Sequence, residues 1–67
     1  MRATWWDGAM LKEAREKRGM TQTELAEKVG VNRVTVNRIE SGARNPSMAL
    51  LQKIARVLRV RLRITLD

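Results

Sequence analysis

The stretch Thr21–Gly42, TQTELAEKVGVNRVTVNRIESG, contains the signals for two short helices joined by one tight turn. Thr21 and Glu24 form a capping box, in which each side chain satisfies a backbone N–H that the first helical turn leaves free. Gly30 is expected to end this helix, because helices commonly terminate in a left-handed residue and glycine adopts that conformation without steric cost. Asn32 is a good N-cap for the second helix. The two helices are therefore separated by a very short turn.

This turn is too short for an antiparallel hairpin and suits the steep crossing of a helix-turn-helix. At about 100° per residue, the second helix has two different faces. The inward, core face holds Thr35, Val36 and Ile39. The opposite face holds Arg33, Val34, Asn37, Arg38 and Ser41.

The outward face of the second helix has the groups that read base edges in the DNA major groove. Arginine pairs with guanine, asparagine pairs with adenine, and a small apolar side chain contacts the thymine methyl group. An ordinary solvated helix face has a similar composition, so this pattern alone favours neither interpretation. The short turn and the basic composition of the chain favour double-stranded DNA as the partner.

The segment that begins at Leu11, LKEAREKRGMTQTELAEKVGVNRVTVNRIESGARNPS, resembles the phage repressor and Cro family of helix-turn-helix proteins. With the following helix to Leu58, the resemblance covers about three quarters of the chain. It implies that the bases are read by Asn32, Arg33, Val34, Asn37 and Arg38. It implies that DNA phosphates are bound by Thr21, Gln22, Ser41, Arg44 and Asn45. Gln22 would also brace the base-reading side chains.

Arg15 falls near the inward side of the first helix, where a charge is unfavourable unless it is paired. The resemblance implies that its partner is Glu40, which would tie the first helix to the reading helix. No second carboxylate, His or Cys lies near Glu40 in the motif to share acid–base or nucleophilic work. We therefore expect no catalytic residues, and the chain is not expected to be an enzyme.

The composition agrees with a small DNA-binding domain. The chain has 67 residues, no Cys and no His, with 14 Lys and Arg against 7 Asp and Glu, for a formal net charge of +7. Neither a disulfide, a metal site nor a cofactor is expected. A positive excess favours a polyanion, and basic membrane-surface helices share it. With no long apolar run, the sequence predicts no membrane partner and a cytoplasmic protein that joins the nucleoid when bound to DNA.

The first helix has two possible beginnings. Thr4 and Asp7 predict a helix over about Trp5–Arg18, with Gly8 inside it at a cost of about 1 kcal/mol relative to Ala. Alternatively, the helix begins near Asp7. The adjacent tryptophans before it either cover the edge of the core or serve as an exposed anchor. The residues expected to face the core from this helix are Met10, Leu11 and Ala14.

A fourth helix is expected after the loop that contains Pro46. Ser47 is its predicted N-cap. Apolar residues then recur at spacings of three and four, at Met48, Leu51, Ile54, Ala55 and Leu58. This helix is expected to close the core.

The last residues alternate with a period of two, which is typical of a β-strand. The apolar positions are Val60, Leu62, Ile64 and Leu66, and the residues between them are Arg61, Arg63 and Thr65. A lone strand needs a partner for its backbone groups. We therefore predict that this strand pairs antiparallel with its copy in a homodimer and forms the dimer interface. The expected organisation is one all-α helix-turn-helix domain over residues 1–67, with a helical core over 1–58 and a dimerisation strand over 60–66.

A four-helix core that ends in one short strand resembles the HipB-type antitoxins, which repress their own operon and hold a kinase-fold toxin. Arg59 departs from many family members outside that group, which have Gly at the end of this helix. The resemblance implies a dimeric repressor that binds a palindromic operator and acts as an antitoxin. The alternative is a stand-alone phage-type repressor or controller protein without a toxin partner.

Overall fold

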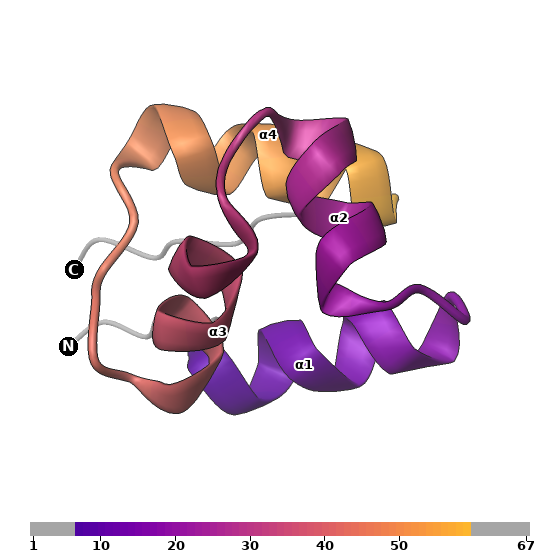
Figure 1. Cartoon of the computed structure of the whole chain (residues 1–67), viewed down its shortest axis with the longest axis horizontal. Helices are drawn as coiled ribbons and strands as arrows, with labels where there is room; N and C mark the ends of the chain where they lie inside the picture. The colour runs from indigo at the N-terminus through magenta and orange to yellow at the C-terminus, as the bar shows by residue number, and fades with distance from the viewer. Residues whose placement is uncertain (1–6, 60–67) are drawn as a thin grey trace, which may run out of the picture.

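The computed structural model describes residues 7–59, and its regular structure there is entirely helical. The helices are α1 (Gly8–Lys17), α2 (Gln22–Val29), α3 (Arg33–Ser41) and α4 (Met48–Leu58). α3 packs on α1 and α2, while α2 also packs on α4. In Figure 1 the α2–α3 pair lies between α1 and α4. The predicted four-helix, all-α architecture is confirmed, whereas the predicted strand over residues 60–66 lies outside the described residues.

The turn between α2 and α3 follows the local signals in the sequence. Thr21 Oγ1 accepts a hydrogen bond from the Glu24 N–H at 3.0 Å, and the Thr21 N–H donates to Glu24 Oε1 at 2.8 Å. Gly30 ends α2 in the left-handed conformation, with φ 87°. The Asn32 side chain then accepts from the Val34 N–H at 2.7 Å. The capping box, the glycine stop and the second N-cap are confirmed.

α1 begins at the later of its two possible starting points. The Asp7 side chain accepts a hydrogen bond from the Met10 N–H at 2.9 Å and caps the helix. Gly8 follows it because the backbones of α1 and α3 approach closely at this position. A Cβ on Gly8 would lie 2.4 Å from the Glu40 carbonyl oxygen and 2.5 Å from that of Ile39. The glycine is therefore needed for helix packing.

The core is a single cluster to which every helix contributes. Its buried residues are Leu11, Leu25, Ala26, Val29, Val36, Ile39, Ile54 and Leu58. Leu51 and Ala55 of α4 are buried as well. The predicted burial of two residues is wrong, since Met10 is 40% exposed and Met48 is 49% exposed. Both lie in the first turn of a helix. Helical periodicity assigns a residue to a face, but it does not say how far along the helix a neighbouring helix extends.

α4 ends at Arg59, which adopts the left-handed conformation with φ 57° and ψ 40°. Arginine thus takes up a conformation that costs an L-residue roughly 1 to 2 kcal/mol. Arg18 Nη2 donates to the Arg59 carbonyl oxygen at 3.4 Å. This contact joins the C-terminal ends of α1 and α4. None of the helices between residues 7 and 59 is long and apolar enough to cross a membrane.

Candidate nucleic-acid interface

The outward face of α3 is fixed by the packing of its other side. Val36 and Ile39 are fully buried against the neighbouring helices, and Thr35 is half-buried. The residues predicted to read bases are all exposed, and among them Val34 is 46% exposed. They are Asn32, Arg33, Val34, Asn37 and Arg38. The structure thus presents these five residues to solvent along the exposed side of α3 and its N-cap.

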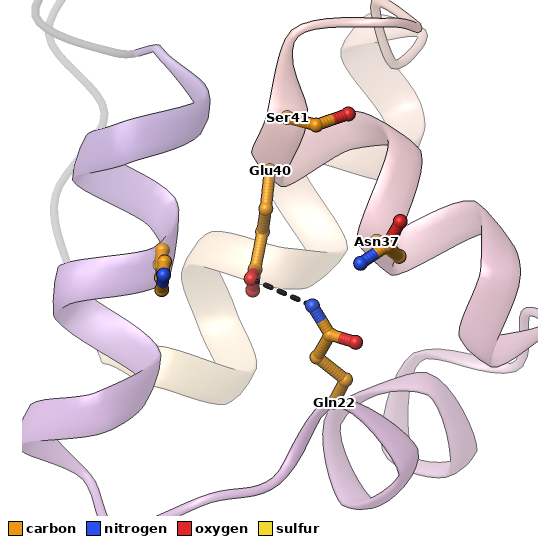
Figure 2. Close-up of a pocket in the computed structure, with 5 residues that line it drawn as sticks. Gln22, Asn37, Glu40 and Ser41 are labelled. Atoms are coloured by element: carbon orange, nitrogen blue, oxygen red, sulfur yellow. Dashed lines mark hydrogen bonds between the residues drawn. The ribbon is translucent and has the colours of Figure 1, made fainter.

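The predicted readers differ in how free their polar groups are. Asn32 uses its side-chain oxygen to cap α3 through the Val34 N–H, so only its NH₂ group remains for another partner. Asn37 lies on the exposed side of α3, beside a shallow hollow, and its side chain is directed toward that of Gln22 (Figure 2). Of these two asparagines, Asn37 therefore has the freer amide.

The hollow lies where α1, the start of α2 and the end of α3 meet. It has a volume of about 130 Å³, and its lining residues are Lys12, Gln22, Asn37, Glu40 and Ser41. The helical pattern predicts only that Lys12 faces solvent, and nothing in the sequence distinguishes it from the other outward lysines. Its position beside three predicted DNA contacts makes it a further cationic candidate for this surface.

Beneath the hollow, the structure brings together the two residues expected to pair. Arg15 Nε donates to Glu40 Oε2 at 2.6 Å, and Arg15 Nη2 donates to Glu40 Oε1 at 3.1 Å. Their side chains are only 9% and 3% exposed. Arg15 Nη1 also donates to the Met20 carbonyl oxygen at 2.6 Å. The hydrogen bond with Glu40 raises the pKa of Arg15 above its ordinary value, so the guanidinium remains charged.

Gln22 connects this buried pair to the exposed surface. Its Nε2 donates to Glu40 Oε1 at 3.0 Å, as Figure 2 shows. On the other end of the same amide, Gln22 Oε1 accepts from Arg33 Nη1 at 3.4 Å, which is a long hydrogen bond. One residue at the start of α2 therefore contacts both the ion pair and a candidate base reader. The sequence pattern contains no signal for the contact between Gln22 and Glu40.

The residues expected to bind phosphate are exposed except for Gln22, which is half-buried. Thr21 is occupied in the capping box at the start of α2. The Ser41 hydroxyl donates to the Arg38 carbonyl oxygen at 3.1 Å. Arg44 and Asn45 lie in the loop after α3. Arg44 offers the positive charge of this loop, and Lys12 offers a second positive charge from α1.

The site and the fold have clear relatives. The profile of the HTH_3 helix-turn-helix family matches residues 11–64. The chain belongs to this family. A protein of Archaeoglobus fulgidus, described as an uncharacterized HTH-type transcriptional regulator, is 54% identical over 52 residues, which are 78% of this chain and 74% of that protein. The HTH-type transcriptional regulator SinR of Bacillus subtilis is 38% identical over 61 residues, or 90% of this chain and 55% of SinR.

Solved helix-turn-helix structures share the arrangement of these helices. The restriction-modification controller protein C.AhdI from Aeromonas hydrophila superposes with a TM-score of 0.78 at 35% identity, over 81% of this chain and 82% of that chain. SinR, solved in complex with DNA, superposes with a TM-score of 0.76 at 38% identity, over 81% of this chain and 87% of that chain.

Proposed function

We propose that this helix-turn-helix protein is a DNA-binding transcriptional regulator that reads its operator with α3. The observation that best supports the proposal is the exposed face of α3. There an apolar group and hydrogen-bonding groups lie together, next to the buried Arg15–Glu40 ion pair. Regulators and a restriction-modification controller among its relatives support the same class of function. The net charge of +7 favours approach to a polyanion.

Each exposed side chain has a distinct role in this proposal. Arg33 reads guanine through its two-pronged guanidinium, Asn37 reads adenine, and Val34 contacts a thymine methyl group. Asn32 and Arg38 contact bases at the margins of the same groove. Phosphates are bound by Thr21, Gln22, Ser41, Arg44 and Asn45, with Lys12 added from α1. Phosphate contacts position the protein, whereas base contacts supply the specificity.

A comparison of Arg33→Ala with Arg44→Ala tests these roles. We expect Arg33→Ala to lose about 1 to 3 kcal/mol on the selected site and to relax preference at one base pair. Arg44→Ala is expected to weaken all sequences alike and to reduce the salt slope by about one. Both are measured by fluorescence anisotropy against selected and random duplexes. Equal losses for Arg33→Ala on the two kinds of DNA would refute its assignment as a base reader.

We further propose that the protein binds DNA as a homodimer. The support is the alternating pattern of residues 60–66, in which Val60, Leu62, Ile64 and Leu66 form the apolar side of the proposed antiparallel ribbon. Joining two reading helices makes the second half-site contact intramolecular and can raise affinity by about 10² to 10⁴. The expected operator is then a palindrome whose half-sites lie about one helical turn apart, or a multiple of it.

Truncation after Arg59 tests the dimer. The truncated chain is expected to fold, to sediment as a monomer and to bind single half-sites weakly. The control is the full chain at the same concentration. A truncated chain that sediments as a dimer with full operator affinity would place the interface on the helices instead.

Two biological roles follow from different observations. The antitoxin role, with a kinase-fold toxin as partner, rests on the resemblance of the tail to HipB-type proteins. A stand-alone repressor or controller role is favoured by the likeness to C.AhdI and SinR. Purification of the native protein from its own cells separates them. A kinase-fold protein recovered in stoichiometric amount supports the antitoxin role, and recovery of the regulator alone supports the other.

A further inference from the structure

A series of hydrogen bonds links Arg15, Glu40, Gln22 and Arg33. The buried Arg15–Glu40 pair sets which group donates and which accepts at each step. Arg15 can only donate, and it directs Nε and Nη2 at the two oxygens of Glu40. The Glu40 carboxylate receives these bonds on both of its oxygens and acts as the acceptor. The side chain of Glu40 is only 3% exposed, and its oxygens accept from Arg15 and Gln22. The buried pair therefore presents a carboxylate oxygen of Glu40 to the side chain of Gln22.

The Gln22 amide must direct its NH₂ group, and not its oxygen, toward Glu40. Gln22 Nε2 lies 3.0 Å from Glu40 Oε1, on the inner end of the amide. Its carbonyl oxygen is then forced to the outer end, where it accepts from Arg33 Nη1 at 3.4 Å. An amide turned the other way would direct an NH₂ group at Arg33, which has only donors. The orientation of Gln22 thus decides whether Arg33 has a partner on the protein.

We infer that Glu40 is a positioning residue for base reading, which holds Arg33 in place by fixing the orientation of the Gln22 amide. This inference rests on the proposed function, in which Arg33 reads a base. Arginine has five N–H donors, so one can remain on Gln22 while two others meet a guanine. A partner on the protein reduces the rotamer freedom that a long, exposed side chain loses when it binds. Glu40 thereby acts on specificity without touching DNA.

Replacement of Glu40 by glutamine is expected to exchange the donor and acceptor ends of the Gln22 amide. The introduced amide would turn its only acceptor oxygen toward the donors of Arg15 and its NH₂ group toward Gln22. Gln22 would then turn its own oxygen inward and direct its NH₂ group at Arg33, where two donors face each other. We expect Glu40→Gln to lose preference at the base pair read by Arg33 by about 2- to 12-fold, the value of one hydrogen bond.

Exchange of the two side chains restores the acceptor. In the double variant Glu40→Gln/Gln22→Glu, the new carboxylate accepts from the amide below it and from Arg33 above it. We therefore expect the double variant to regain the preference that Glu40→Gln loses. If Glu40 served only to tie α1 to α3, the exchange would restore nothing, because Arg15 would still lack a carboxylate on α3.

The experiment selects binding sites from a random duplex library with the wild-type chain, Arg33→Ala and each variant in parallel. Glu13→Gln is the control, since it removes the same charge from an exposed site on α1. All selections are made at low temperature, where circular dichroism shows which variants are folded. If Glu40→Gln is unfolded there, Glu40→Asp replaces it, because it keeps the charge beside Arg15 and withdraws the carboxylate from Gln22 by one methylene.

The expected result is that Gln22→Met and Glu40→Gln relax the same base pair that Arg33→Ala relaxes. Glu40→Gln leaves affinity for random DNA within about twofold, whereas Gln22→Met also lowers it, because Gln22 is a proposed phosphate contact. The exchange variant then recovers that base pair, and Glu13→Gln changes none. If Arg33→Ala relaxes one base pair and the Glu40 variants leave it intact, the positioning role is overturned and the proposed function stands. If the wild-type chain selects no sequence, the proposed function itself fails.

Discussion

Removal of one charge from the Arg15–Glu40 pair is expected to be the most damaging single change in this domain. Arg15→Met leaves the Glu40 carboxylate in a site that is 3% exposed and removes donors that lie 2.6 and 3.1 Å from its oxygens. Two charge-assisted hydrogen bonds correspond to about 3 to 6 kcal/mol, which agrees with the loss of about 3 to 5 kcal/mol that is typical when buried pairs are broken. A domain of 67 residues has a total stability of only about 3 to 10 kcal/mol.

The assay is urea unfolding followed by circular dichroism, with free energies obtained by linear extrapolation. Lys12→Met is the matched control, because it removes an exposed cation from the same helix and is expected to change stability by less than about 0.5 kcal/mol. Arg15→Met/Glu40→Leu removes both charges and is expected to recover most of the loss, since apolar replacements of buried pairs are often neutral. A double variant as unstable as the two single losses combined would refute the pairing.

Three further changes test individual features of the fold. The Thr21 N–H holds the pKa of Glu24 below its ordinary 4.5. The ionised Glu24 therefore stabilises the fold fully above that pH, and this stabilisation is lost as the pH falls toward the lowered pKa. The decrease in thermal midpoint caused by Glu24→Gln is expected to become smaller in acid, and a decrease that does not change with pH would contradict this. Arg59→Gly relieves a positive φ and is expected to raise the unfolding free energy by about 1 kcal/mol, whereas a lower urea midpoint would count against strain at that residue. Gly8→Ala is expected to lower the unfolding free energy by about 1 to 3 kcal/mol in spite of the better helix propensity of alanine, because its Cβ would meet the Glu40 carbonyl oxygen at 2.4 Å; an increase in the thermal midpoint would show that α1 can shift away.

The parts of the fold that sequence predicts well are those set by neighbouring residues. The capping box of Thr21 and Glu24, the stop at Gly30 and the cap at Asn32 each involve groups within a few positions of one another. Their geometry is determined by backbone conformation before any tertiary contact forms. For this reason the turn that defines the family can be located to the residue.

Specific contacts between helices cannot be predicted from the pattern of residue types along the sequence. The propensity cost of Gly8 is visible in the sequence, but the approach of α3 that requires a glycine is not. Gln22 is assigned to DNA by resemblance, and its contact with Glu40 joins residues 18 positions apart on different helices. Lys12 looks like any solvated lysine until α1 is placed beside the end of α3. Such pairings depend on helix crossing geometry, which hydrophobic periodicity does not encode.

The packing of α3 between α1 and α2 has a consequence for the thermodynamics of binding. The reading helix is also a core helix, with Val36 and Ile39 fully buried and its C-terminal end against Gly8. Its backbone amide protons are therefore expected to exchange with solvent only when the whole domain opens. DNA then meets a backbone that is already ordered, so the conformational entropy that the protein loses on binding comes mainly from exposed side chains. Recognition by this small domain should show a modest heat-capacity change, without the large negative one that accompanies the folding of a disordered segment on DNA.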